Sequence, residues 1–277
     1  MALKGVAKQT LAILREGCYI NDKGQTVDFS RQQQAAENGT VLYRPKELLS
    51  MLHKSVDDAA DSEPRIDVTE ETTQCAARRL VENEGIDDLV LLNFASAKNP
   101  GGGFLGGAKA QEEDLARCSG LYPCLLRQPE YYANNRAESS LLYTDHIIYA
   151  PSVPWFRSRS RDRLNNVFLA SVITAPAPNA TQALRKNPGA GMAIEQSLMQ
   201  RAGMVLAVAR ERGHRHMLLG AWGCGVFGNM PYTVATAFQA WLDHPAFKGQ
   251  FDRVVFAIYD KGEKRILKSF KRCLTAT

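Results

Sequence analysis

Short apolar runs alternate with amphipathic stretches from residue 65 to the end of the chain. Six of these runs predict buried strands: 65–68, 89–94, 146–150, 167–174, 216–222 and 253–259. The other stretches have helical periodicity, which predicts helices over 69–83, 112–121, 190–212, 233–243 and 263–273. Thr69 is expected to be the N-cap of the first helix. Strands that alternate with helices predict a three-layer α/β/α sandwich around a mixed, largely parallel sheet.

The first 64 residues are patterned differently. Residues 3–16 predict an amphipathic helix, and the polar residues 21–24 between two short apolar runs predict a hairpin. Residues 45–54 predict a helix with a proline at its first position, but the rest of 32–62 is polar and carries no clear pattern. We therefore expect an N-terminal extension over 1–64 that packs on a core over 65–277, within one structural domain.

Composition narrows the class of protein without indicating an activity. The 277 residues are 45% hydrophobic and 23% charged, which is ordinary for a globular protein and argues against a disordered chain. The net charge of +5 is compatible with a polyanionic ligand but is common without one. None of the six cysteines forms a C-x-x-C pair, so reduced thiols are expected, and neither a signal peptide nor a membrane span is visible. A cytoplasmic location follows by default.

Two glycine-rich loops directly follow predicted strands, at the edge of an α/β sheet where ligands bind. The first contains Gly101, Gly102 and Gly103, and the second runs from 223 to 228. Turns of this kind point several backbone N–H groups at one spot, which suits phosphate oxygens. The second loop matches G-x-G-x-x-G as a string, but it lacks the acidic residue that follows a dinucleotide fingerprint. A tight turn that needs small residues is the alternative.

Glu112 and Glu113 open a predicted helix shortly after the glycine triplet. Neighbouring helical residues diverge by about 100°, so the two side chains cannot face each other like the carboxylate pair of an ordinary glycosidase. One carboxyl group can still protonate a leaving oxygen and then activate water. Acidic residues also favour the first turn of any helix, and the glycine triplet is what favours catalysis over that alternative.

The segment from Asn93 to Gly103, followed by Gln111-Glu112-Glu113, resembles the signature of the poly(ADP-ribose) glycohydrolases. Segment 222–229 is similar to the diphosphate-binding loop of that family, and the short spacer and compact size resemble its bacterial-type branch. The resemblance covers about residues 65–260. It implies a macrodomain that hydrolyses ribose–ribose O-glycosidic bonds of poly(ADP-ribose), mainly from the chain end, and releases ADP-ribose without a metal or organic cofactor.

The same resemblance implies roles for individual residues. Glu113 would be the general acid/base and would enter the reaction protonated, Glu112 would bond ribose hydroxyls, and Gln111 would support the pair. The residues expected to bind the rest of the substrate are Gly101, Gly102 and Gly103, with Asn99 at the distal ribose; Gly223, Gly225 and Val226, whose N–H groups would meet the pyrophosphate; Phe227, against the terminal ribose or adenine; and Cys224, Thr69 and Glu70. Thr69 and Glu70 are candidates for the adenine side that no motif fixes. Cys224 is expected to pack in its loop and not to act as a nucleophile.

Other polar residues have plainer interpretations. The arginines at 157, 159, 161 and 163 are expected in a solvated loop, with contact to polymer phosphates as the alternative. His146 is expected at a strand edge and without a catalytic role. His214 and His216 lack further metal ligands in the sequence around them.

The expected partners are poly(ADP-ribose) and ADP-ribose, with ADP-ribosylated proteins as carriers; a monomer without membrane or direct nucleic-acid contacts is expected. Two other functions stay open: a macrodomain that binds ADP-ribose without cleaving it, and a hydrolase that removes single ADP-ribose groups. A pure binding module needs no acid at the helix start, which weighs against the first. A shared ADP-ribose pocket leaves the second open.

Overall fold

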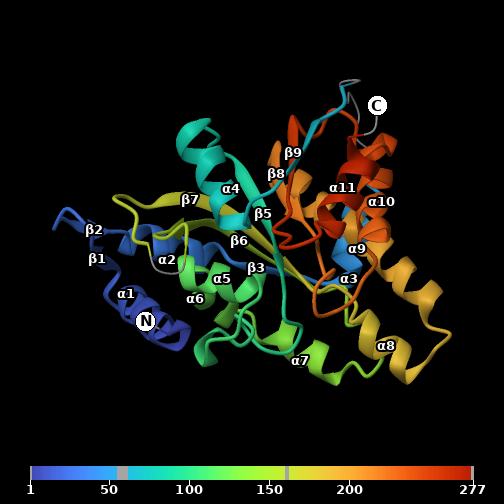
Figure 1. Cartoon of the computed structure of the whole chain (residues 1–277), viewed down its shortest axis with the longest axis horizontal. Coiled ribbons are helices and arrows are strands. Elements are labelled where there is room, and N and C mark those ends of the chain that lie inside the picture. Colours follow the sequence, from blue (N-terminus) through green and yellow to red (C-terminus); the bar gives the residue numbers. More distant parts are fainter. Residues whose placement is uncertain (1, 55–61, 160–161, 276–277) are drawn as a thin grey trace.

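A seven-stranded sheet forms the centre of the molecule (Figure 1). The computed structural model describes residues 2–54, 62–159 and 162–275. In spatial order the strands are β3 (Val41–Tyr43), β6 (Ile147–Trp155), β7 (Phe168–Ala175), β5 (Leu89–Phe94), β8 (His216–Gly220), β9 (Arg253–Ala257) and β4 (Arg65–Thr69). The last five are parallel to one another, and β6 runs antiparallel to both β7 and β3. The predicted mixed, largely parallel sheet is confirmed.

Helices cover both faces of this sheet and complete the predicted three-layer sandwich (Figure 1). One face carries α3 (Pro45–Leu52), α9 (Gly191–Glu211), α10 (Pro231–Leu242) and α11 (Arg265–Leu274). The other face carries α2 (Ser30–Gly39), α4 (Thr73–Arg78) with a π-helical turn over Arg79–Asn83, α5 (Gln111–Cys118), α6 (Leu121–Leu126) and α7 (Pro129–Ala137). The short helix α8 (Ala180–Lys186) lies beside α9.

Alternate residues of each strand enter opposite halves of the core, because side chains in a strand point to opposite faces. Val90 and Leu92 of β5 join the half that contains α9 and α10. Leu89 and Leu91 join the half that contains α4 and α5. The continuous apolar run that predicts β5 therefore reflects burial on both faces of the sheet.

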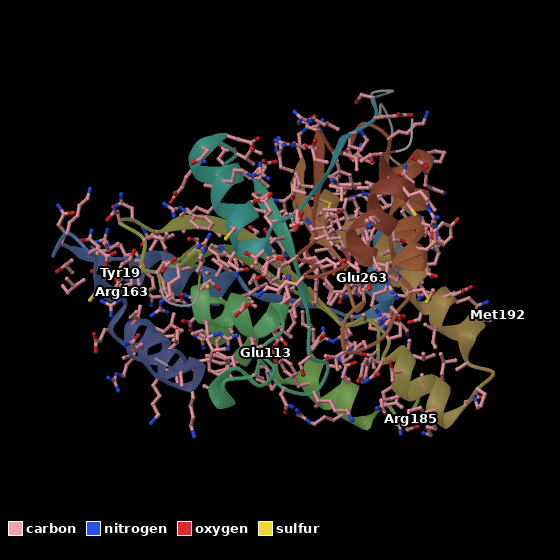
Figure 2. The ribbon with its side chains drawn as sticks, in the orientation of Figure 1. Tyr19, Glu113, Arg163, Arg185, Met192 and Glu263 are labelled. Atoms are coloured by element: carbon pink, nitrogen blue, oxygen red, sulfur yellow. The ribbon has the colours of Figure 1, made fainter. Side chains whose placement is uncertain are left out.

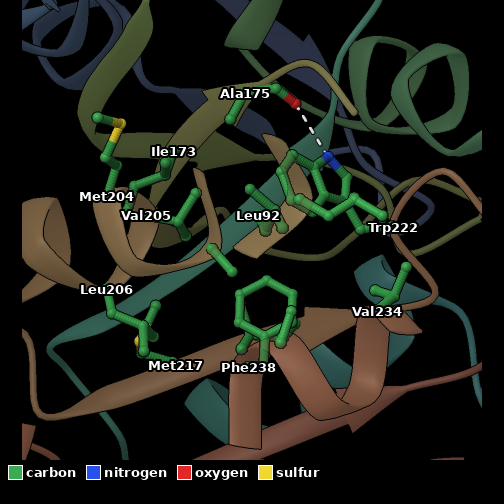
Figure 3. Packing of buried hydrophobic residues seen from close by; sticks show 14 of the residues in the cluster. Leu92, Ile173, Ala175, Met204, Val205, Leu206, Met217, Trp222, Val234 and Phe238 are labelled. Carbon is green, nitrogen blue, oxygen red and sulfur yellow. Dashed lines mark hydrogen bonds between the residues drawn. The ribbon is translucent and has the colours of Figure 1, made fainter. Parts of the chain in front are cut away.

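A tryptophan just beyond β8 ties two strand ends together inside the first half of the core (Figure 3). The indole Nε1–H of Trp222 donates to the carbonyl oxygen of Ala175 at 3.1 Å, at the end of β7. Its ring lies 6.1 Å from that of Phe238 on α10, measured between centroids. The buried aromatic pair thus holds the sheet edge from which the second glycine loop departs.

The residues before 65 form a helix, a hairpin and part of the main sheet. Helix α1 (Leu3–Glu16) and the antiparallel strands β1 (Cys18–Ile20) and β2 (Thr26–Asp28) confirm the predicted helix and hairpin. Strand β3 is an edge strand of the seven-stranded sheet. The division at residue 64 stays an interpretation of the sequence, and the sheet itself crosses it.

Several predicted boundaries differ from the structure, and two of them are wrong for a clear local reason. Thr69 is the last residue of β4, and the N-cap of α4 is Thr72, whose hydroxyl accepts a hydrogen bond from Cys75 N at 3.4 Å. Strand β6 does not end at Pro151 but continues to Trp155, because a register shift between Ala150 and Val153 leaves the proline outside the regular ladder.

Several elements lie where the sequence carries no clear signal. Helix α2 is polar and buries only Gln33 and Ala36, and β3 has just three residues. Part of the unassigned stretch, 55–61, lies outside the described residues. Helices α6, α7 and α8 were likewise not expected. Among the described residues, none of the helices is both long enough and apolar enough to cross a bilayer.

Truncation of the buried aromatic on α10 should destabilise the fold. Phe238 is fully buried between the rings of Trp222 and Phe256. Phe238→Ala should lower the free energy of unfolding by roughly 3–5 kcal/mol, because it removes burial and leaves a cavity. Tyr232→Ala on the same helix, where the side chain is 54% exposed, is the matched control and should change it by less than about 0.5 kcal/mol. Urea denaturation measures both; equal effects would contradict this account of the core.

Candidate active site

The two glycine-rich loops leave the same edge of the sheet. They follow β5 and β8, which are parallel neighbours, so both begin at carboxyl ends of adjacent strands. These strands pair only from Leu89 to Leu91 on β5. Beyond that point the Gln111 side chain replaces β8: its Nε2 donates to Leu92 O at 2.8 Å and its Oε1 accepts from Phe94 N at 2.9 Å. Gln111 therefore fastens the start of α5 to the opening between two strands.

The glycine triplet passes directly over the start of α5. Gly101 and Gly102 have φ values of 68° and 57°, in the left-handed region that side chains disfavour. Phe104, just after the triplet, is fully buried and packs against Ala7 of α1 and Ala116 of α5. Phe104 thus anchors the loop in the core. The backbone of Gly102 lies in close contact with the side chains of Glu112 and Glu113.

Glu113 lies at this junction, near the middle of the molecule (Figure 2). Its side chain is 9% exposed, and Oε1 accepts a hydrogen bond from the backbone N–H of Gly103 at 2.9 Å. A Cβ on Gly102 would collide with the same oxygen. Oε2 accepts no hydrogen bond from any described residue. One oxygen of Glu113 is therefore held by the loop, and the other makes no hydrogen bond within the described chain.

Glu112 is held by the protein on both oxygens. Ser96 N donates to Oε2 at 2.6 Å, and the Asn93 amide donates to Oε1 at 3.2 Å. The side chain is only 2% exposed. Burial raises the pKa of Glu112 to about 8, although the hydrogen bonds from Ser96 and Asn93 favour the charged form. Burial thus favours the protonated form of this carboxyl group over the charged form.

Sequence reasoning missed the two groups that hold Glu112. Asn93 is a fully buried amide at the end of an apolar strand, and Ser96 contributes a backbone N–H. A polar residue at the end of a continuous apolar run is a usable signal, since a buried amide needs partners. The backbone donor leaves no trace in the sequence.

The second glycine loop presents unused backbone donors. Gly223 and Gly228 adopt φ values of 70° and 68°, and the Asn229 side chain closes the loop by donating to Gly223 O at 3.1 Å. The backbone N–H groups without an acceptor anywhere in the described chain include those of Gly223, Gly225, Val226 and Phe227. Donors gathered on one turn suit an anion. The loop has the form expected of a diphosphate site, and its ligand stays a prediction.

Three other predicted site residues lie at the margins of this arrangement. Asn99 is exposed in the first loop, where its backbone N–H donates to Ser96 Oγ at 3.2 Å. Thr69 ends β4, two strands away from β8, with a buried hydroxyl that finds no partner among the described residues. Glu70 is exposed and pairs with Lys264 at 2.8 Å. The adenine-side roles of Thr69 and Glu70 stay predictions.

Burial excludes one nucleophile at this edge. Cys224 lies in the second loop, and burial raises the pKa of its thiol to about 12, so the thiolate is scarce at neutral pH. No group of three or more histidine, cysteine, aspartate or glutamate side chains in the described chain could hold a metal ion. His146, next to β6, uses both ring nitrogens, with Thr144 Oγ1 at 2.9 Å and Asn134 Nδ2 at 3.1 Å.

The arginine run divides into a buried and an exposed part. The expectation of a solvated loop is wrong for Arg157, which is 1% exposed and donates to Thr10 Oγ1 and to Arg117 O at 2.7 and 2.8 Å. Arg159 and Arg163 are exposed, as expected, and Arg161 lies outside the described residues. Arg163 lies beside the β1–β2 hairpin, away from Glu113 (Figure 2).

The buried Glu112 should make stability depend on pH in a defined direction. Below pH 4.5 the group is protonated in both the folded and the unfolded chain. Between 4.5 and about 8 only the unfolded chain ionises, so the stability of the folded chain falls as pH rises. Glu112→Gln removes this titration. The unfolding free energy of the variant, minus that of the wild type, should rise across this window by up to roughly 1.4 kcal/mol per pH unit.

Denaturation at several pH values measures this difference. Glu130→Gln is the control, because the hydrogen bond from Arg44 lowers the pKa of exposed Glu130 and the difference should run the other way, in the acid range. A difference for Glu112→Gln that stays flat between pH 5 and 8 would mean that the folded chain carries Glu112 ionised.

Comparison with known proteins places this geometry in a family. A model of the microbial-type PARG catalytic domain matches residues 7–158. The chain is similar to the crystal structure of poly(ADP-ribose) glycohydrolase from Thermomonospora curvata, with 43% identity over 98% of this chain and 99% of that chain and a TM-score of 0.93. The same protein bound to the inhibitor ADP-HPD matches with 43% identity, 98% of each chain and a TM-score of 0.89.

A structure from a second organism agrees. Poly(ADP-ribose) glycohydrolase from Deinococcus radiodurans in complex with ADP-ribose matches with 44% identity over 87% of this chain and 96% of that chain, and a TM-score of 0.81. No curated protein sequence matches closely enough to count as a relative. The family model covers more than half of the chain, and the glycine triplet, the two glutamates and the second loop lie together at one sheet edge; this chain belongs to the family of microbial-type poly(ADP-ribose) glycohydrolases.

Proposed function

We propose that this chain hydrolyses the ribose–ribose O-glycosidic bonds of poly(ADP-ribose), mainly from the chain end, and that Glu113 transfers the protons. Membership of the family supports the activity. The role of Glu113 is supported by the different surroundings of its two oxygens. Oε1 accepts a hydrogen bond from Gly103 N–H, whereas Oε2 accepts none within the described chain. A fixed carboxyl group with one unused oxygen suits an acid that meets its substrate at one atom.

A single carboxyl group can serve both halves of the reaction. Protonated Glu113 would donate its proton to the bridging oxygen as the bond from C1 to that oxygen breaks, leaving an oxocarbenium-like ribose. The carboxylate would then accept a proton from the water that attacks C1. Burial favours the neutral form of Glu112, which would lessen the repulsion on the Glu113 carboxylate formed between the two steps.

The second loop supplies the complementary half of the site. Its free N–H groups, those of Gly225, Val226 and Phe227 among them, would hold the diphosphate of ADP-ribose. Thermomonospora and Deinococcus relatives are crystallised with ADP-HPD and ADP-ribose, which supports this class of ligand. We propose poly(ADP-ribose) and ADP-ribose as ligands, ADP-ribosylated proteins as carriers, and a monomeric enzyme.

Removal of the acid should abolish turnover and spare binding. Glu113→Gln should lower the rate of ADP-ribose release by about 10²–10⁴-fold, the usual contribution of a general acid/base. ADP-ribose affinity should stay within about threefold, because glutamine keeps an oxygen for the Gly103 N–H. Chromatography of products from purified polymer measures the first, and calorimetry the second. Glu195→Gln, exposed on α9, is the matched control and should keep full activity.

The same experiment separates the other two functions. Near-normal polymer degradation by Glu113→Gln would remove Glu113 from the proton transfer. A wild-type chain that binds ADP-ribose but releases none from the polymer would be a binding macrodomain. Release only from proteins that carry single ADP-ribose groups would identify the mono-ADP-ribosyl hydrolase.

A methyl group at position 102 should disturb the acid without unfolding the chain. The added Cβ would collide with Glu113 Oε1, and the left-handed φ of 57° disfavours alanine. Gly102→Ala should therefore lower kcat by about 100-fold, the order expected for a misplaced catalytic group. Gly106→Ala is the control in the same loop, since its Cβ would meet no atom within 4 Å. Equal rates for both variants would contradict the contact between the glycine turn and the acid.

A further inference from the structure

A buried arginine lies behind the second glycine loop and is not explained by catalysis. Arg201, on α9, is 1% exposed. Its guanidinium donates to Asp145 Oδ1 through Nε at 3.0 Å and through Nη2 at 2.8 Å, and to Pro176 O through Nη1 at 2.6 Å. Nη2 also reaches Leu142 O at 3.2 Å and Tyr143 O at 3.4 Å. One side chain thus gathers the segment 142–145 and the residue that follows β7.

The gathered segment has an uncommon backbone. Leu141 and Tyr143 have φ values of 65° and 62°, although neither is glycine. Left-handed residues with large side chains are rare, cost free energy, and collect at sites where the surrounding structure imposes them. Here Arg201 bonds the carbonyl oxygens of Leu142 and Tyr143, which lie on either side of the Tyr143 Cα, and so holds this conformation. The result is a fixed direction for the Tyr143 side chain.

That side chain points to the predicted substrate residue of the second loop. The rings of Tyr143 and Phe227 lie 6.0 Å apart between centroids, tilted by 42°. Both residues are partly exposed. The distance lies within the range of aromatic pairs that attract each other. Two partly exposed rings therefore lie side by side at the second loop.

Further hydrogen bonds connect segment 141–145 to the residues after β7 and to the second loop. Asn179 N donates to Leu141 O at 2.9 Å, and Thr181 N donates to Phe227 O at 3.0 Å. Asn229 Nδ2 donates to Pro178 O at 2.8 Å. These bonds connect segment 141–145, segment 176–181 and the second loop into one unit. Arg201 holds this unit from α9, a helix of 21 residues.

We propose that Tyr143 is a substrate-contacting residue that forms one aromatic wall with Phe227 against ADP-ribose, and that Arg201 is the positioning residue that sets this wall. The inference rests on the proposed function, since it assumes that the second loop holds the diphosphate. Aromatic rings contribute to the binding of nucleotides through stacking on bases and contact with sugars. A rigid ring beside the loop would orient the sugar before the acid reaches its oxygen.

A merely structural role for Arg201 fits less well. A buried ion pair seldom adds net stability, because desolvation offsets the attraction, and apolar residues of similar volume do as well. Arg201 also donates to three loop carbonyls, and these accept no hydrogen bond from a strand or a helix backbone in the described chain. Such an arrangement fixes geometry in a part of the chain that has no regular structure to do so.

The test compares binding in four variants of the full chain by titration calorimetry with ADP-ribose. Tyr143→Ala should raise the Kd about tenfold, and Tyr143→Phe, which keeps the ring, less than about threefold. Arg201→Met should raise the Kd about tenfold or more. The double variant Arg201→Met/Tyr143→Ala should bind about as weakly as Arg201→Met alone. In Arg201→Met the Tyr143 ring is already displaced from the ligand, so its removal costs no further affinity.

A matched control lies on the same helix. Arg210 donates to Ala246 O at 2.8 Å and to Met51 O, far from segment 141–145 in the sequence and on another part of α9. Arg210→Met should lower the melting temperature without changing the Kd. With polymer as substrate, Arg201→Met should raise KM about tenfold and change kcat less than about threefold, since Glu113 is untouched. A loss of folded protein would instead lower the binding stoichiometry and the apparent kcat at unchanged KM.

The outcomes separate this inference from the proposed function. If the wild-type chain binds and cleaves normally but Tyr143→Ala binds ADP-ribose equally well, the aromatic wall is wrong and the proposed function stands. If Arg201→Met changes only stability and stoichiometry, its positioning role is wrong. If the wild-type chain releases no ADP-ribose although the variants weaken binding as expected, the proposed function fails and the aromatic wall stands.

Discussion

The site depends on a close contact between the backbone of Gly102 and the carboxylate of Glu113. A Cβ at position 102 would collide with Oε1 of Glu113, so only glycine fits there. The contact is possible only because the backbone of Gly101 and Gly102 turns through the left-handed region and carries no side chain there. It makes the first loop and α5 a single unit, since neither can shift without moving the acid. The hydrogen bond from Gly103 N–H to Glu113 adds direction to this contact. The remaining features of the site support this unit from different sides.

The two glutamates differ because the loop meets them differently. They diverge on α5 as neighbours in a helix must, yet both carboxyl groups lie beside Gly102 because the turn passes over the end of the helix. Glu112 is bonded by Asn93 and Ser96 and its burial raises its pKa, whereas Glu113 keeps an oxygen that accepts no hydrogen bond within the described chain. The environment therefore assigns separate tasks to adjacent identical residues, as neighbouring carboxyl groups in catalytic sites commonly require.

Local patterns predicted the parts of the fold that depend on local physics. The apolar run of β5 was predicted with its observed bounds, and the start of α5 was misplaced by only one residue. The prediction failed where a neighbour decides the outcome. Thr69 looks like a cap, but pairing with β9 extends the strand through it, so Thr72 caps the helix. The prolines of β6 suggest an end, but a bulge accommodates the first of them.

The site shows the same division. The glycine triplet and the glutamates follow from residue type and spacing, whereas the partners of Glu112 depend on contacts between segments. Gln111 was expected to support the two glutamates, and the sequence did not predict that its amide bonds the exposed end of β5 in place of a strand. A charged run in the sequence indicates solvent, but it cannot show that Arg157 turns inward to bond the last turn of α5.

Buried arginines solve a problem that loops beside an active site create. Backbone carbonyls in such loops have no ladder or helix to accept for them, and leaving them unpaired inside the protein costs free energy. A guanidinium carries five donors in a fixed plane and can therefore satisfy several carbonyls at once. Arg117, fully buried in α5, does this for the first loop, at Ala108 O, and Arg201 does it behind the second loop, at Pro176 O and Leu142 O. A buried guanidinium therefore bonds the chain beside each of the two loops from inside the protein.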